Sequence, residues 1–142
     1  MSDIEFLSEE TEFLLENEAR IIEWLNTIAK QENSTIGQLT YIFCSDDYLL
    51  NINREYLNHD YYTDIITFDN SLDSDAEILG DIFISIDRVT DNASEFNVPI
   101  QNELHRVMAH GVLHLLGYGD KTPDEQKVMR QKEEACISLL SD

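Results

Sequence analysis

The stretch His110-Gly111-Val112-Leu113-His114-Leu115-Leu116-Gly117-Tyr118-Gly119-Asp120 carries the clearest indication of how this chain folds. It continues a segment that Pro99 opens and that is apolar nearly all the way round a helix, which predicts a buried helix. Gly117 is the residue type that commonly ends a helix, at the position just after its last turn. The sequence therefore predicts a buried helix over 99–116, followed by a sharp turn that brings the chain back.

The same stretch predicts a metal site. His110 and His114 are four residues apart, which places them about 40° apart around the helix axis and about 6 Å apart along it. Two imidazoles in this arrangement can bind one zinc ion at the usual distance of about 2.0–2.1 Å. Asp120 follows the turn and can supply a carboxylate as the third ligand. Three protein ligands leave one coordination position for water, which is typical of catalytic zinc, so we predict one zinc ion per chain at His110, His114 and Asp120.

The alternative is that both histidines are hydrogen-bonded core residues, and a bare pair at this spacing would favour that interpretation. The complete pattern, which includes Gly117 and Asp120, arises by chance in roughly one chain in several thousand. We therefore favour metal binding. His105 is expected on a different face of the helix from His110, as a surface or core residue.

Two other metal-dependent classes are alternatives, one because of its spacing and one because of its ligand set. Metzincin proteases have the pattern H-E-x-x-H-x-x-G-x-x-H, in which the glutamate is the general base. Gly111 stands at the position of that glutamate, which argues against proteolysis. A site with two histidines and one carboxylate can also hold iron(II) in an oxygenase, but no motif for a co-substrate accompanies it here.

Outside this stretch, hydrophobic periodicity predicts alternating helices and strands. The expected strands cover part of 4–15, then 39–44, 64–68 and 78–85, with an acidic loop over 69–75. The expected helices cover 18–30, a segment that Ser45 caps and that turns Leu49, Ile52 and Tyr56 inward, and 87–96. The last helix has Thr122 as N-cap, Pro123 at its first position and Glu125 completing a capping box, with an inner stripe of Val128, Met129, Ala135, Cys136, Leu139 and Leu140. These elements predict a single α/β (α+β) domain over 1–142: one small mixed sheet covered by helices, with the zinc site on a buried C-terminal helix.

Composition limits the function further. The net charge is −20, so a broad basic surface for nucleic acid is excluded, although five of the nine basic residues lie in the C-terminal third. No apolar run is long enough to span a bilayer, and the segment that follows Met1 lacks the features of a secretory signal. Cys44 and Cys136 form no C-x-x-C pair and are expected to be reduced, buried thiols. We therefore expect a cytoplasmic protein without a membrane partner.

The stretch 110–118 resembles the H-G-x-L-H-L-x-G-Y signature of the YbeY family, which are bacterial single-strand-specific endoribonucleases and rRNA maturation factors. The resemblance extends upstream. Asn53 and Tyr56, followed by Thr63-Asp64-Ile65-Ile66-Thr67-Phe68, are similar to the family block N-x-x-(Y/F)-x(6)-T-D-V-L-S-F, and Gly80-Asp81-Ile82 is similar to its G-D-I strand. The resemblance covers roughly residues 35–140.

This resemblance implies a small mixed-sheet domain with a zinc ion in a cleft. It implies work on ribosomal RNA, quality control of the small ribosomal subunit, and contact with ribosomal or assembly proteins. The chain departs from the family at two positions. Most members have a third histidine where this chain has Asp120, and many have an arginine where this chain has Leu57.

We therefore expect a zinc-dependent, single-strand-specific endoribonuclease that acts in rRNA maturation. The candidates for further catalytic roles are Arg54, His59, Asp64 and Tyr118, and for Asp64 and Tyr118 a structural role is the favoured interpretation. The alternative is a non-catalytic ribosome-assembly factor with a structural zinc ion, which Leu57 and the charge of −20 favour. A metalloprotease is the third hypothesis. The sequence leaves open which RNA site is cut, whether water or the RNA 2′-hydroxyl attacks, and the oligomeric state.

Overall fold

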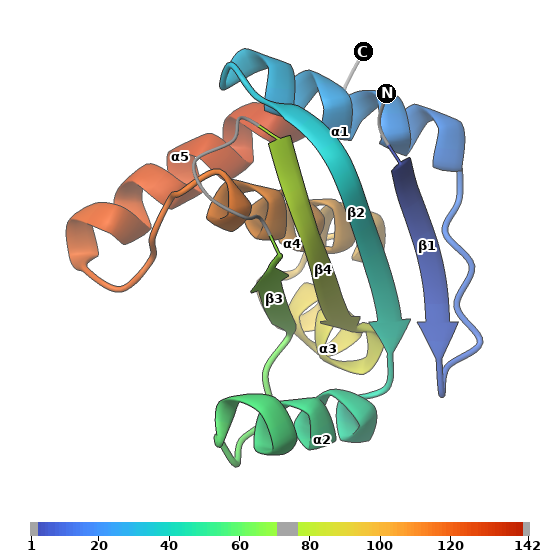
Figure 1. Cartoon of the computed structure of the whole chain (residues 1–142). Coiled ribbons are helices and arrows are strands. Elements are labelled where there is room, and N and C mark those ends of the chain that lie inside the picture. The colour runs from blue at the N-terminus through green and yellow to red at the C-terminus, as the bar shows by residue number, and fades with distance from the viewer. Residues whose placement is uncertain (1–2, 71–76, 141–142) are drawn as a thin grey trace.

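The computed structural model describes residues 3–70 and 77–140, and this part of the chain forms one four-stranded sheet and five helices (Figure 1). The strands are β1 (Asp3–Glu9), β2 (Thr35–Cys44), β3 (Ile65–Asp69) and β4 (Glu77–Ser85). The helices are α1 (Glu18–Gln31), α2 (Asp46–Leu57), α3 (Ile86–Phe96), α4 (Ile100–Leu115) and α5 (Pro123–Ser138). The predicted α+β class is confirmed.

The sheet is mixed, with the strand order β1-β2-β4-β3. β1, β2 and β4 run parallel, and β3 pairs antiparallel with β4 at the edge. Tyr41 lies opposite Ile82 and Phe43 lies opposite Ile84 across the central strand pair. All four side chains are buried, since alternate residues of a strand point to the same face of the sheet.

The two faces of the sheet are covered unequally. The main hydrophobic core joins one face to α1, α3, α4 and α5, and includes Trp24, Leu25, Tyr41, Phe43, Val89, Met108, Val112 and Met129. A smaller cluster of Cys44, Leu49 and Ile66 lies between the sheet and α2. Figure 1 shows α4 behind β3 and β4, with α5 leading away from the sheet. As predicted, α4 is the most deeply buried helix, and it brings the histidines to the β3 edge of the sheet.

Several predicted helix ends are confirmed. The Ser45 side chain accepts a hydrogen bond from the Tyr48 backbone at 3.1 Å, as an N-cap should. Thr122 and Glu125 form the predicted capping box at the start of α5. Gly117 has a φ of +107°, a conformation that side chains other than glycine rarely adopt, and it ends α4 as expected.

The predicted strand bounds needed correction. The first strand ends at Glu9, within the predicted range, whereas β2 begins at Thr35, earlier than the predicted strand over 39–44. The first residues of β2 were not predicted as strand because several of them are polar. They are extended all the same, because a strand between two neighbours in the sheet is held by backbone hydrogen bonds whatever its side chains are. Most of the predicted acidic loop, 71–75, lies outside the described residues.

Three predicted inward side chains are wrong. Tyr56 is 66% exposed at the end of α2, and on α5 Val128 is 42% exposed and Ala135 is also exposed. Met129 and Cys136 are buried as predicted. The buried stripe of α5 is therefore narrower than its apolar residues indicated, and it includes the acidic side chain of Glu133.

Both cysteines are buried and free, as predicted. Burial raises the pKa of Cys44 to about 12 and that of Cys136 to about 11, so both remain protonated thiols at neutral pH. Among the described residues, no helix combines the length and hydropathy needed to cross a bilayer.

Candidate metal centre and its cleft

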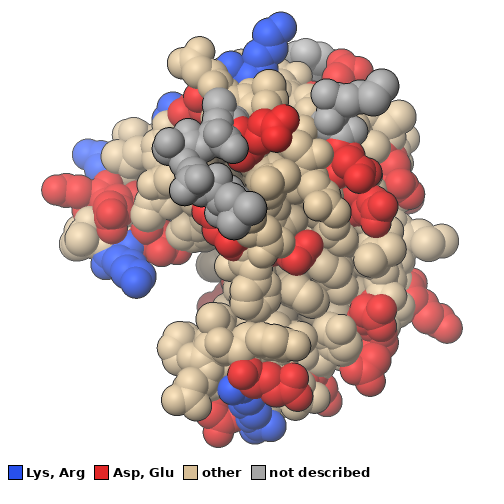
Figure 2. All heavy atoms as spheres, viewed as in Figure 1, with Lys and Arg blue, Asp and Glu red and all other residues tan. Residues whose placement is uncertain are grey.

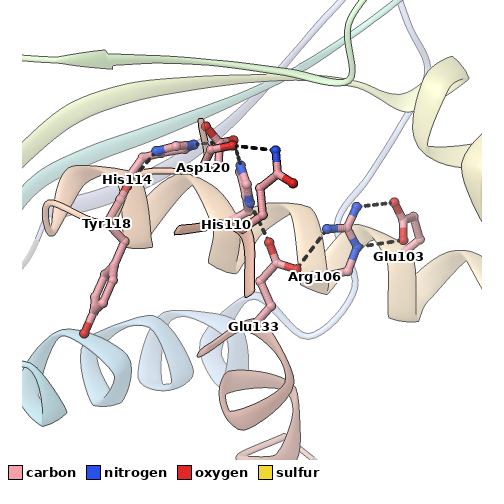
Figure 3. A network of polar contacts seen from close by, with 8 residues as sticks. Glu103, Arg106, His110, His114, Tyr118, Asp120 and Glu133 are labelled. Atoms are coloured by element: carbon pink, nitrogen blue, oxygen red, sulfur yellow. Dashed lines mark hydrogen bonds and ion pairs between the residues drawn. The ribbon is translucent and has the colours of Figure 1, made fainter. Parts of the chain in front are cut away.

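Helix α4 and the turn after it bring the three predicted ligands together (Figure 3). One oxygen of Asp120 lies 3.3 Å from Nε2 of His110 and 3.3 Å from Nε2 of His114. The two imidazole rings are nearly perpendicular, with centroids 4.5 Å apart. One ligand atom from each residue lies within 4.8 Å of the other two, and no other group of this kind is found among the described residues.

The turn between the helix and Asp120 is held by its backbone. The Tyr118 backbone N–H donates to the Leu113 carbonyl at 3.0 Å, and the Gly117 backbone N–H donates to the His114 carbonyl at 3.0 Å. On the far side of the turn, the Gln126 side chain donates to the Asp120 carbonyl at 3.1 Å. Because both flanks are anchored in this way, Asp120 is held beside the two histidines.

Each histidine is oriented by a second acceptor. His110 Nδ1 lies 2.5 Å from a carboxylate oxygen of Glu133, and His114 Nδ1 lies 2.9 Å from the Tyr118 carbonyl. A carbonyl can only accept, so His114 Nδ1 carries the hydrogen and its Nε2 presents a lone pair. An acceptor behind the ring is the usual arrangement for a metal-binding histidine. The donor set and its orientation therefore fit a divalent metal such as zinc.

Glu133 is itself part of a buried ion-pair network (Figure 3). Its carboxylate is 5% exposed and accepts from Arg106 at 3.0 Å, and Arg106 also pairs with Glu103 at 2.7 Å. Burial raises the pKa of Glu133, but the hydrogen bond with His110 and the charge of Arg106 outweigh it, so the pKa is lowered overall. Glu133 therefore stays ionised behind His110.

The three ligands lie at the edge of a cleft of about 570 Å³. Its other walls come from the end of α2, the loop after it and β3, and are formed by Asn53, Leu57, His59, Tyr61, Thr63, Asp64, Ile65, Ile66, Thr67, Asp69, Leu115 and Lys121. Figure 2 shows the molecule hollowed between the surface over α2 and the surface over α5. The upstream residues that resemble the family block and the histidine stretch thus meet at one cleft.

The other candidate residues are distributed unevenly around this cleft. His59 and Asp64 line it, whereas Arg54 lies outside it and pairs with Asp60 at 2.5 Å. The hydroxyl of Tyr118 donates to Glu32 at 2.6 Å and does not line the cleft, so only its backbone carbonyl contributes to the centre. His105 packs edge-on against Trp24, apart from the metal ligands, as expected.

Asp64 is the most deeply placed of these candidates. Burial raises its pKa, and the charges of Arg106 and His110 act in the opposite direction without cancelling that effect. Its backbone carbonyl accepts from Ser85 at 2.9 Å, which fixes the start of β3 against β4. Asp64 is therefore a fixed carboxyl group on the cleft wall that holds its proton more strongly than a surface aspartate.

Two groups that shape the site were given no role from the sequence, although Asn53 stands in the stretch that resembles the family block. Asn53 is buried, and its side-chain amide donates to the Tyr61 carbonyl at 2.9 Å. Its backbone carbonyl accepts from the His59 backbone N–H at 3.1 Å, so Asn53 anchors the cleft loop. Its spacing from buried Leu49, four residues earlier, is the signal that could have revealed it. Glu133 could have been found in the same way, as an acidic residue four positions after buried Met129.

Comparisons with known proteins agree with this geometry. A sequence model of the family described as "Endoribonuclease YbeY" matches residues 3–141. A protein of the same name from Cytophaga hutchinsonii is 59% identical over 134 residues, covering 94% of this chain and 93% of its own length. One from Flavobacterium johnsoniae is 50% identical over 131 residues, covering 92% and 93%.

A solved structure shares the fold. The solution structure of the Thermotoga maritima protein TM1509 has a TM-score of 0.66 and 28% identity, and the match covers 94% of this chain and 86% of that one. The fold, the full-length matches and the histidine stretch all lead to one assignment. This chain belongs to the YbeY endoribonuclease family.

Proposed function

We propose that this protein is a zinc-dependent endoribonuclease that cuts single-stranded RNA during rRNA maturation and small-subunit quality control. The observation that carries the proposal is the convergence of His110, His114 and Asp120 at the edge of an open cleft. Structural zinc sites are usually closed by four protein ligands, whereas catalytic sites keep a position open. Three ligands beside a cleft suit catalysis, with one zinc ion per chain.

The chain's own residues have separable roles in this proposal. Zinc bound there would supply Lewis-acid polarisation of a phosphate oxygen and activation of a water molecule. Glu133 and the Tyr118 carbonyl orient the two imidazoles from behind. Asp64 and His59, which line the cleft, would orient the RNA or exchange a proton with it. Arg54 is the weaker candidate because its guanidinium is engaged by Asp60 outside the cleft.

A non-catalytic assembly factor with a structural zinc ion is the second candidate function. Two observations favour it: the net charge of −20, and Leu57 on the cleft wall where many relatives have arginine. The cleft itself is the argument against it, since a structural ion has no need of a cavity beside it.

Proteolysis is disfavoured by packing as well as by sequence. A Cβ atom at Gly111 would lie 2.8 Å from the Ile82 side chain and 3.1 Å from that of Ile65. A side chain there would have to displace Ile82 or Ile65 where α4 packs against the sheet. The position of the metzincin general base is therefore occupied by a glycine that is tightly packed against the sheet.

The same proposal covers the domain, the compartment and the partners. We treat residues 1–142 as one hydrolase domain, and we place it in the cytoplasm, where the buried thiols Cys44 and Cys136 stay reduced. The acidic faces of the molecule, visible in Figure 2, suit contact with basic ribosomal or assembly proteins on the small subunit. The ribosome would then concentrate the enzyme at its RNA.

A cleavage assay tests the proposal. Zinc-loaded protein is incubated with a labelled single-stranded RNA, with the same sequence in a duplex, and with casein. We expect cleavage of the single strand only, and loss of that cleavage in His114→Ala. Peptide cleavage that depends on His114 would support a protease instead, and an inactive wild type that binds small subunits would support the assembly factor.

A further inference from the structure

A second hollow adjoins the metal centre on the α5 side. It has a volume of about 400 Å³ and shares His110 and Asp120 with the first cleft. Its remaining lining residues are Arg106, Gln126, Lys127, Met129, Arg130 and Glu133. Two of the three candidate ligands therefore lie between two openings, one bounded by α2 and β3 and the other bounded by α5.

Most of the positive charges that have no acidic partner in the described part of the chain line these openings. Arg54, Arg88, Arg106 and Lys132 are all in ion pairs, and Arg20 donates to the Leu140 carbonyl. Within residues 3–70 and 77–140, no side chain pairs with the remaining four cations, which are Lys30, Lys121, Lys127 and Arg130. Three of these four line one of the two hollows that meet at the metal centre.

The two hollows differ in charge. The first is lined by Asp64, Asp69 and Asp120 against Lys121 alone, apart from the histidines. The second is lined by Arg106, Lys127 and Arg130 against Asp120 and Glu133, and Glu133 is already engaged by Arg106 and His110. A phosphate group is therefore repelled less on the α5 side than on the α2 side.

We propose that Lys127 and Arg130 form a phosphate-binding track that leads the backbone of single-stranded RNA to the metal centre, with Lys121 at the opposite edge. Lys127 and Arg130 are three residues apart on α5, so they project from one face of the helix. Among the described residues, Lys121 is the only lysine or arginine that lines the first cleft. The inference rests on the proposed function and specifies how that site holds its substrate.

The track explains how an acidic protein can bind a polyanionic substrate. With a net charge of −20, the surface as a whole repels RNA, so binding depends on a few cations that no carboxylate neutralises. Three phosphate contacts predict a dependence of log affinity on log salt with a slope of about −2, at about −0.7 for each contact with a single strand. This slope is shallow compared with that of a protein that has a broad basic surface.

The test compares single substitutions that remove one positive charge each. Lys127→Gln and Arg130→Gln lie on the track, and Lys30→Gln is the matched control, because Lys30 is unpaired and lines neither hollow. Binding of zinc-loaded protein to a short fluorescein-labelled oligouridylate is followed by anisotropy across a salt series, with gels to verify that the probe is intact. Circular dichroism and melting temperature verify that each variant is folded.

We expect each track variant to make the salt slope shallower by about 0.7 and to raise KM more than it lowers kcat, whereas Lys30→Gln changes neither. Variants that bind and cleave as Lys30→Gln does would overturn the track and leave the nuclease proposal standing. Loss of binding in the track variants, with a wild type that cleaves no RNA, would support the track and contradict the nuclease proposal. A wild type that does not bind the probe would overturn the track directly.

Discussion

His110 and His114 have the same side chain but different supports. His114 is held by a backbone carbonyl of its own turn, whereas His110 is held by Glu133, which lies 23 residues later in the sequence on another helix. A backbone acceptor is present whenever the turn folds. A side-chain acceptor depends on one residue, so the orientation of His110 can be tested by substitution.

Glu133→Gln is expected to weaken zinc binding by about 10–100-fold, because an amide is a poorer acceptor for the His110 N–H than a carboxylate. Competition with a chromogenic chelator measures this affinity without reference to activity. Glu134→Gln is the matched control, since Glu134 is the next residue on α5 and is exposed. An unchanged affinity in Glu133→Gln would show that Glu133 serves only as an ion-pair partner of Arg106 and does not support the metal ligand.

Prediction from sequence succeeded best where a residue type has one dominant local role. Gly117, Thr122 and Glu125 were placed correctly because turn and cap geometry is set within a few residues. The roles of Glu133 and Asn53 were not predicted because their partners are distant or lie in an irregular loop, and hydrophobic periodicity carries no information about such pairs.

The packing of α4 against the sheet depends on Gly111, where an added Cβ would meet the Ile82 Cδ1 atom at 2.8 Å. Gly111→Ala gains about 1 kcal/mol of helix propensity, but overpacking a core costs about 1–3 kcal/mol. We expect a net loss of about 1 kcal/mol in the free energy of unfolding, measured by urea denaturation.

A second substitution tests the cause. Ile82→Val removes the methyl group that the new Cβ would meet. Alone, this substitution usually lowers the free energy of unfolding by about 0.5–1.5 kcal/mol. In the Gly111→Ala background it should lower it by less. Strictly additive effects of the two substitutions would mean that the contact between α4 and β4 is not what requires glycine.

Three elements meet at Glu32, at the end of α1. The Tyr118 hydroxyl donates to it at 2.6 Å from the metal-site turn, and Lys132 of α5 pairs with it at 3.0 Å. The hydrogen bond from Tyr118 lowers the pKa of Glu32, burial opposes this effect, and Lys132 adds to the lowering. The folded state therefore favours the ionised form of Glu32.

This shift predicts a pH dependence of stability. A carboxyl whose pKa is lowered on folding stabilises the protein above its ordinary value of 4.5, and that contribution is lost as the pH falls from 4.5 through the lowered pKa. We expect Glu32→Gln to lower the free energy of unfolding by about 1 kcal/mol at neutral pH and by less at low pH. Urea denaturation over a pH series measures the difference. Glu23→Gln, at an exposed position on the same helix, is the control, and an equal effect in both variants would contradict the role given to Glu32.

The fold class and the main elements were predictable because the segments that form α4, β2 and β4 are rich in apolar residues and are bounded by turn and cap residues. Strand order was not predictable, because it depends on pairings between distant segments. β2 pairs with β4 and not with β3, the next strand along the chain, and β3 forms the edge of the sheet. The candidate metal ligands could be named from local spacing. The cleft could not, because it is formed by the α2 loop and β3 meeting α4 across more than forty residues of sequence.

The distribution of charge over the whole molecule distinguishes the binding of free RNA from the cleavage of RNA. Most of the surface repels RNA, and three of the unpaired cations, Lys121, Lys127 and Arg130, line the hollows beside the metal centre. Weak binding to free RNA is therefore compatible with cutting it, provided that a partner such as the small subunit holds the enzyme in place. The central claim is narrower than this: the cluster of His110, His114 and Asp120 is the centre at which RNA is cut.

Removal and return of the metal tests that claim most directly. Protein stripped with a chelator is titrated with zinc, and cleavage of a labelled single-stranded RNA is followed against bound zinc per chain. The account predicts no cleavage without metal, a rise that saturates at about one equivalent, and no recovery in His114→Ala at any zinc concentration. Cleavage that persists in the stripped protein, or that returns in His114→Ala as fully as in wild type, would contradict it.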